Sequence, residues 1–332
     1  MDLSEVAALL NGTIMFAIPL LLVALGGMFS ERSGVINIAL EGVMVVGALI
    51  SYLFMSKVSG SAWAIANPQL MVLLAVLISA FAGGLFSLLL AFASIHLKAD
   101  QTISGTSLNM VAPAFAVVLT WAIQGQGQTT IYSPSNINIT PEMLGLSMGI
   151  KDSFFGIMIF RGLNLTIPIA LILWIVSYVL LKKTKFGLRL RSCGEHPQAA
   201  DSVGINVYKM RYFGVALSGI LAGIGGLSYT LATGSGFVGT VLGYGFLALA
   251  VMIFGNWNPL RIMAAALFFA FFKVISGMAT EISFLPKFEG VQDVQYIYQM
   301  LPYIVTLVVL AFTSKKSRAP KAEGIPYDKS TR

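Results

Sequence analysis

Long apolar stretches alternate with short polar ones along the chain, and the apolar stretches have the length of membrane-spanning helices. They cover nine ranges: 14–29, 36–55, 70–95, 105–123, 165–181, 212–232, 243–255, 260–279 and 298–313. A helix needs about 20 apolar residues to cross the hydrocarbon core of a bilayer. The pattern therefore predicts an all-α membrane protein, a polytopic bundle of about nine (8–10) transmembrane helices. The short range 243–255 is typical of a broken or re-entrant helix.

The composition agrees with this class and excludes several others. Of the 332 residues, 57% are hydrophobic and 11% are charged, whereas charged residues make up about 25% of a soluble domain. Alternating segments of about ten residues, which a membrane β-barrel would need, are not visible. The single cysteine, Cys193, excludes an internal disulfide and a Cys-based zinc cluster, and only His96 and His196 could add histidine ligands. We therefore expect neither a metal site nor a cofactor.

The N-terminus does not have the pattern of a cleaved signal peptide. Asp2 and Glu5 stand where such a peptide would be basic, so the first helix is expected to remain.

The basic residues are distributed unevenly between the two sides of the predicted bundle. Counted from an external N-terminus, sixteen Lys and Arg residues fall in the inner segments and four in the outer ones. An excess of basic residues marks the cytoplasmic side of a membrane protein. The sequence thus predicts a multi-pass protein of the bacterial plasma membrane with its N-terminus outside and its C-terminus in the cytoplasm. The net charge of +7 follows from this topology, and nucleic acid is not an expected partner.

The chain divides into a transmembrane domain, 1–313, and a cytoplasmic tail, 314–332. The transmembrane domain contains a basic cytoplasmic loop, 182–211, and a long polar external connection between Gln124 and Asn164. The tail is polar and basic and contains two prolines, so its composition predicts a mostly disordered segment.

Two segments of the chain resemble each other. Ser33–Ile50 aligned with Ser235–Met252 gives four identities in eighteen positions, among them Gly34 with Gly236 and Leu40 with Leu242. The helix of the second segment comes five predicted helices after that of the first, with four between them, so the two would cross the bilayer in opposite directions. An inverted repeat of this kind builds a transport path at the interface of its two halves. Chance similarity is the alternative.

Asn37 and Glu41 are polar residues inside an otherwise apolar range. Four residues apart, they would share one face of a helix. A carboxylate within the membrane is costly and is tolerated against protein or water. The pair would therefore either line a translocation path or brace it through hydrogen bonds. Lys273 could pair with Glu41, but we favour an orientation toward the outer surface.

Two further groups are candidates for the same path. Gln101 and Asn109 lie at the cytoplasmic start of a predicted helix, which Asp100 could cap. Capping and hydrogen bonds between helices explain them, with contact to cargo as the alternative. Phe237 and Tyr244 lie among several glycines near the second repeat. They could stack against a flat ring, although aromatic packing is the more common explanation.

The basic loop contains a short predicted helix. Pro197 suits the first position of a helix and Gly204 suits its end, so a helix over 197–203 is expected. Such a helix, with the small residues Ala199 and Ala200 exposed, favours docking into a groove of a partner protein.

Five segments resemble one family. ERSGVINIALEGVM is similar to the signature of permease subunits of bacterial ABC importers for nucleosides, within the simple-sugar and branched-chain amino acid permease group. The resemblance continues through ADQTISGTSLNMVAP, FGLRLRSCGEHPQAADSVGI, GYGFLALAVMIFGNWNP and APKAEGIPYDK.

The resemblance implies a fold like that of type II ABC importers and a set of partners. These are an ATP-binding subunit, a second permease subunit, an extracytoplasmic substrate-binding lipoprotein or periplasmic protein, the surrounding membrane lipid and a nucleoside as cargo. It also implies that the basic loop couples the permease to the ATP-binding subunit through Glu195, His196, Pro197, Ala199, Ala200, Asp201 and Gly204.

The energy for transport would come from outside this chain. No G-x-x-x-x-G-K-[ST] phosphate-binding loop occurs in the sequence, so we expect a translocation subunit and not an enzyme. Two alternatives remain open. One is an ABC permease for a ribose-like sugar, and the other is an ion-coupled secondary transporter in which Glu41 carries the coupling proton.

Overall fold

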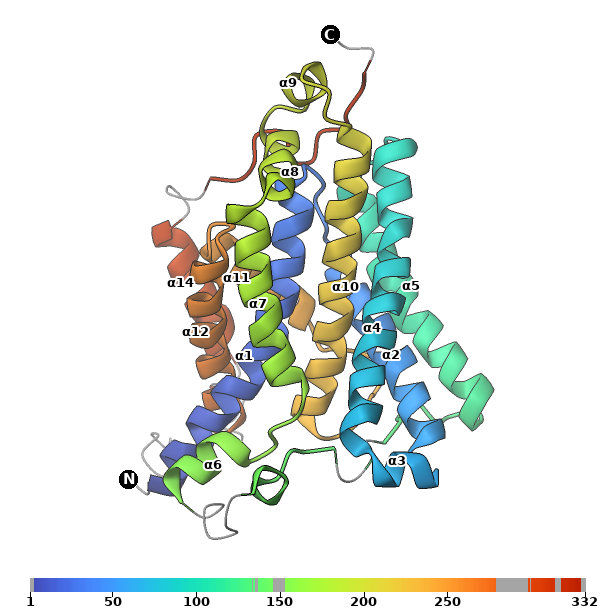
Figure 1. Cartoon of the computed structure of the whole chain (residues 1–332), viewed down its shortest axis with the longest axis vertical. Helices are drawn as coiled ribbons and strands as arrows, with labels where there is room; N and C mark the ends of the chain where they lie inside the picture. Colours follow the sequence, from blue (N-terminus) through green and yellow to red (C-terminus); the bar gives the residue numbers. More distant parts are fainter. Residues whose placement is uncertain are drawn as a thin grey trace.

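The computed structural model describes residues 3–132, 134, 137–145, 153–278, 298, 300–313 and 318–329. Within these ranges the chain folds into a bundle of helices (Figure 1). Among the described residues, seven helices are long and apolar enough to cross a membrane. They are α1 (Leu3–Arg32), α2 (Leu40–Val58), α4 (Pro68–Ala91, continued by a π-helical turn to His96), α5 (Gln101–Gln124), α7 (Thr166–Lys183), α10 (Val207–Thr233) and α12 (Pro259–Gly277).

Two of the predicted helices are shorter than a membrane span. α11 (Tyr244–Phe254) has 11 residues and α14 (Leu301–Thr313) has 13. The predicted range 243–255 is thus a short helix, as its length indicated. The remaining helices lie in the connections, and they are α3 (Ala62–Ala66), the 3₁₀ turn Pro141–Leu144, α6 (Phe154–Phe160), α8 (Lys185–Glu195) and α9 (Pro197–Ser202).

α1 and α10 form the centre of the bundle, with α2 and α4 on one side and α12 on the other (Figure 1). Glycines on α10 allow the close approach of its neighbours. A Cβ atom on Gly226 would lie 2.0 Å from the carbonyl oxygen of Met44, and one on Gly223 would lie 2.2 Å from that of Ser79. Small residues at helix contacts are the usual means of close packing in membrane bundles.

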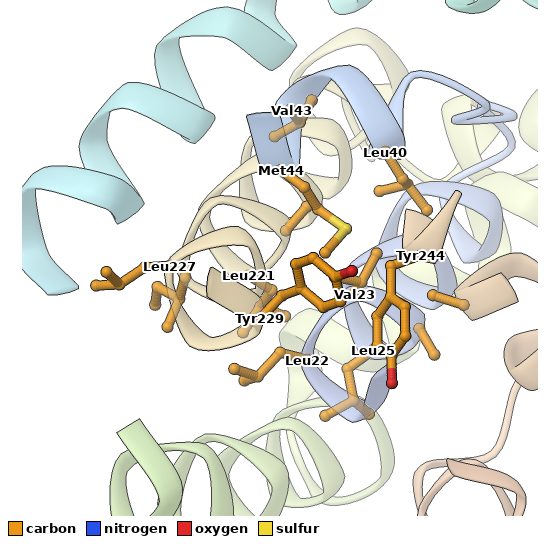
Figure 2. Packing of buried hydrophobic residues seen from close by; sticks show 14 of the residues in the cluster. Leu22, Val23, Leu25, Leu40, Val43, Met44, Leu221, Leu227, Tyr229 and Tyr244 are labelled. Carbon is orange, nitrogen blue, oxygen red and sulfur yellow. The ribbon is translucent and has the colours of Figure 1, made fainter. Parts of the chain in front are cut away.

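The interior between these helices is apolar. Figure 2 shows side chains of four helices meeting around Tyr229 and Tyr244, whose ring centroids are 4.5 Å apart. The side chains around them are Leu22, Val23 and Leu25 of α1, Leu40, Val43 and Met44 of α2, and Leu221 and Leu227 of α10.

The two ends of the bundle differ in what covers them. α8, α9 and the C-terminal segment lie at one end, and α3, α6 and the N-terminus lie at the other (Figure 1). The basic loop 182–211 and the described part of the C-terminal segment therefore lie at the same end of the bundle.

The tail is not disordered where the structure describes it, so that prediction is wrong for residues 318–329. Pro320, Ala322 and Tyr327 are buried. The N–H of Ala322 donates to the carbonyl oxygen of Gly194 at 2.8 Å. The composition is polar, but these three apolar side chains pack against the bundle.

Candidate functional site

Glu41 connects the two segments that resemble each other. It is the second residue of α2 and is 7% exposed. Its Oε1 accepts the N–H of Gly243 at 2.8 Å, and its Oε2 accepts the N–H of Gly245 at 2.6 Å. The first N–H groups of a helix have no partner inside the helix and attract negative charge. The Glu41 carboxylate therefore caps α11 and braces it against α2.

The alignment of the two segments reappears in this geometry. It matches Glu41 with Gly243, which are the two residues joined by the hydrogen bond. It also matches Gly34 with Gly236, which have φ angles of +96° and +86°. Such angles are open to glycine at little cost. In both segments this glycine precedes a non-helical stretch that leads into a helix, α2 or α11.

Asn37 lies in the first of these stretches and not on a helix. The prediction that Asn37 and Glu41 share a helix face is wrong, because α2 begins at Leu40. The Asn37 side chain is fully buried, and its Nδ2 donates to Oγ of Ser218 on α10 at 2.8 Å. Asn37 thus holds the stretch before α2 against the central helix.

Gln101 and Asn109 hold the same stretch from α5. Oε1 of Gln101 accepts the N–H of Ile36 at 2.7 Å. Asn109 bonds twice, since its Oδ1 accepts the N–H of Gly42 and its Nδ2 donates to the carbonyl of Ile38, both at 2.8 Å. These bonds satisfy main-chain groups that no helix satisfies at this place. Like Asn37 and Glu41, both side chains thus form hydrogen bonds that hold one segment of the chain against another.

The two predicted stacking residues are enclosed in the bundle. Phe237 is fully buried, and its main chain pairs with Ile131 through bonds of 2.8 and 2.9 Å. Tyr244 is 2% exposed, and its hydroxyl donates to the carbonyl of Phe16 at 3.0 Å. The ring of Phe237 therefore has no access to open space, whereas Tyr244 is one of the residues that border a cavity beside α11.

This cavity has a volume of about 270 Å³ and lies beside the capped end of α11, between α11, α12 and α14. Its polar lining side chains include Lys273, Tyr303 and Thr306, and Phe246 adds an exposed ring. Sequence reasoning missed this group as a site. Helical spacing pairs Tyr303 with Thr306, but nothing in the sequence places α14 beside α11.

The basic loop contains the predicted short helix. α9 begins with Pro197 in its first turn, and Gly204 follows its end with a φ angle of +82°. A groove of about 250 Å³ beside α9 is lined by Ser192, Glu195, His196, Ala199, Ala200, Val203 and Ile205. The Val203 side chain is 73% exposed, so the groove has an apolar rim.

The predicted exposure of Ala200 is wrong. Ala199 faces outward, but Ala200 is only 3% exposed because it lies on the inner face of α9, as Pro197 does. Two acidic residues of the loop form ion pairs with basic residues elsewhere in the chain. Glu195 pairs with Arg32 at 3.6 Å, and Asp201 pairs with Lys329 at 4.0 Å.

Comparison with known proteins gives full-length matches. The family of permease components of branched-chain amino acid transport systems matches residues 9–310. The guanosine ABC transporter permease NupQ of Bacillus subtilis is 42% identical over all of both chains. The nucleoside ABC transporter permease NupC of Lactococcus lactis is 40% identical over 96% of this chain and 95% of its own. The nucleoside ABC transporter permease NupB of the same Lactococcus strain is 24% identical over 92% of this chain and 83% of its own. No solved structure matches significantly.

Proposed function

The chain belongs to the family of permease components of branched-chain amino acid transport systems, and we propose that its activity is that of the membrane-spanning permease subunit of an ABC importer for nucleosides. The observation that carries this function is the identity of 40–42%, over essentially whole chains, to permeases for guanosine and for nucleosides. The chain is a multi-pass membrane protein that moves cargo and performs no catalysis of its own.

An ATP-binding subunit supplies the energy. The groove beside α9, with the exposed residues Ala199 and Val203 in its lining, supports the 182–211 loop as the place where that subunit docks. Closure of the ATP-binding subunits would push or pull α9 and so switch the path between its outward and inward openings.

A second permease subunit completes the path. Because NupC and NupB occur in one organism, we favour a different, NupB-like chain as that subunit. A substrate-binding lipoprotein delivers the nucleoside from outside.

The proposed architecture is that of a type II importer, with about nine helices including α11 and α14, a permease domain 1–313 and a tail 314–332. The bond between Glu41 and Gly243 and the matched glycines support an inverted repeat with its halves meeting at the start of α11. The basic asymmetry supports an external N-terminus and a cytoplasmic C-terminus in the bacterial inner membrane. Asn37, Glu41, Gln101 and Asn109 brace the path in this account.

An ion-coupled carrier is the less favoured mechanism. There Glu41 would have to release and rebind a proton during each cycle. Both of its oxygens already accept main-chain N–H bonds, which give this side chain a structural role that needs no proton transfer.

The cargo is tested by uptake into cells. Deleting the gene is expected to abolish uptake of labelled guanosine, adenosine and uridine at low external concentration, and the intact gene should restore it. Ribose uptake should be unchanged. A loss of ribose uptake with nucleoside uptake intact would show that the cargo is a sugar.

Docking of the ATP-binding subunit is tested on the outer face of α9. The double substitution Ala199→Glu, Val203→Glu places two unpaired charges in the apolar groove and is expected to lower retention of the ATP-binding subunit about tenfold or more. Gln198→Glu adds a charge to the same helix outside the groove and is the matched control, with normal retention expected. Full retention and transport by the double variant would mean that α9 is not the coupling element.

A further inference from the structure

Residues 318–329, which we call the strap, cross the cytoplasmic end of the bundle (Figure 1). The strap begins at the turn between α11 and α12, where the N–H of Arg318 donates to Oδ1 of Asn256 at 3.2 Å. It continues past the end of α8 through the bond from Ala322 to Gly194. It ends between two other elements, since Asp328 accepts from Lys98 at 2.5 Å and Lys329 pairs with Asp201 of α9. The strap therefore touches both halves of the bundle and the coupling loop.

The strap is fixed by a buried arginine on α10. Arg211 is 1% exposed, and its guanidinium NH1 donates to the carbonyl oxygen of Ile325 at 2.9 Å. No carboxylate among the described residues pairs with it. Burial of a guanidinium costs free energy unless it is hydrogen-bonded. The Ile325 carbonyl therefore offsets part of the cost of burying Arg211. Beside it, the Tyr327 ring packs on Tyr208 at a centroid distance of 5.3 Å.

The strap has an inner and an outer face. Pro320, Ala322 and Tyr327 are buried against the bundle, whereas Lys321 and Pro326 are exposed and Ile325 is 58% exposed. A tail without contacts to the bundle would leave all of its side chains exposed, so this division into buried and exposed residues indicates specific packing.

We infer that the strap is a positioning element which transmits the movement of the coupling loop to both halves of the permease. This inference rests on the proposed function, because it presumes that an ATP-binding subunit moves the loop. The strap acts by holding α8 and α9 in a fixed relation to Arg211 of α10 and to the turn between α11 and α12.

Transport and ATP hydrolysis by the purified complex test the inference. Tyr327→Ala removes the buried ring and is expected to lower transport about tenfold or more, while the ATP-binding subunit stays bound and hydrolysis continues. Tyr327→Phe keeps the ring and should transport normally. Ile325→Ser changes the exposed neighbour, keeps the carbonyl that Arg211 needs, and should also transport normally. If Ile325→Ser loses the ATP-binding subunit and Tyr327→Ala does not, the strap is a docking surface and the inference is wrong.

Cys193 reports the position of the strap without any transport. It is the single cysteine of the chain, is fully buried, and precedes Gly194, whose carbonyl holds Ala322. Burial raises the pKa of its thiol to about 11, so in inside-out vesicles it should react slowly with a maleimide. Tyr327→Ala, or a chain ending at Pro326 if that variant is unstable, should raise the labelling rate about tenfold.

Unchanged labelling in both variants would overturn the inference. This readout stays valid if the cargo proves not to be a nucleoside, so a failure of the strap and a failure of the proposed function are distinguishable.

Discussion

Replacing Glu41 with alanine is expected to lower nucleoside transport about a hundredfold at normal levels of the chain in the membrane. The substitution leaves the N–H groups of Gly243 and Gly245 without the carboxylate that accepts them. A buried donor without an acceptor costs about 1–3 kcal/mol, and more when the lost partner is charged. α11 would then lose its fixed place beside α2, where the two halves of the proposed repeat meet. Uptake of labelled guanosine, normalised to chain level, measures the effect.

Glutamine at the same position separates charge from shape. Glu41→Gln keeps one carbonyl oxygen, but its NH₂ group must face one of the two N–H donors. We therefore expect transport between that of the alanine variant and that of the wild type, roughly tenfold below the latter. Wild-type transport by the alanine variant would refute the bracing role, and wild-type transport by the glutamine variant would refute the two-oxygen cap.

Gly226→Ala is expected to remove most of the folded chain from the membrane. Its Cβ would lie 2.0 Å from the Met44 carbonyl oxygen and 2.8 Å from the Met44 Cα, which are main-chain atoms of α2. Because a main chain inside a helix moves only with its helix, α2 and α10 would have to separate. The cost should reach or exceed the roughly 1–3 kcal/mol typical of overpacked cores.

Gly277→Ala is the matched control, since nothing lies within 4 Å of its added Cβ at the end of α12. The amount of chain in the membrane fraction and its thermal stability in detergent measure the difference. Equal amounts and equal stability of the two variants would show that α2 and α10 are not packed as closely as described.

Hydrophobic length was sufficient to place most helices from the sequence. The predicted ranges fall on α1, α2, α4, α5, α7, α10, α11 and α12, because a run of about 20 apolar residues has few alternatives in a membrane chain. Pro197 and Gly204 placed α9 because proline favours the first turn of a helix and glycine favours the position after its end. Glu41 was found because a carboxylate among apolar residues is costly and so conspicuous.

The sequence did not show which residues far apart in the chain contact one another. The partners of Glu41 are main-chain groups more than 200 positions away, and a main-chain group leaves no mark in a sequence pattern. Asn37 was misplaced because the turn at Gly34 delays the start of α2 to Leu40. Glycine alone does not say where a helix begins.

The strap was missed for a different reason. Composition averages over a segment, and 314–332 is polar on average. The three side chains that hold the strap, Pro320, Ala322 and Tyr327, are few, but each has a place against the bundle. The contacts of the strap with Gly194, Tyr208 and Arg211 form only when folding brings these residues near it.

ATP-driven nucleoside uptake in a defined system tests the central claim most directly. Proteoliposomes would contain this chain, its second permease subunit and the ATP-binding subunit, with the substrate-binding protein and labelled guanosine outside and ATP inside. The account predicts accumulation of guanosine that requires ATP hydrolysis and does not respond to an imposed proton gradient. Accumulation driven by the gradient without ATP would contradict it.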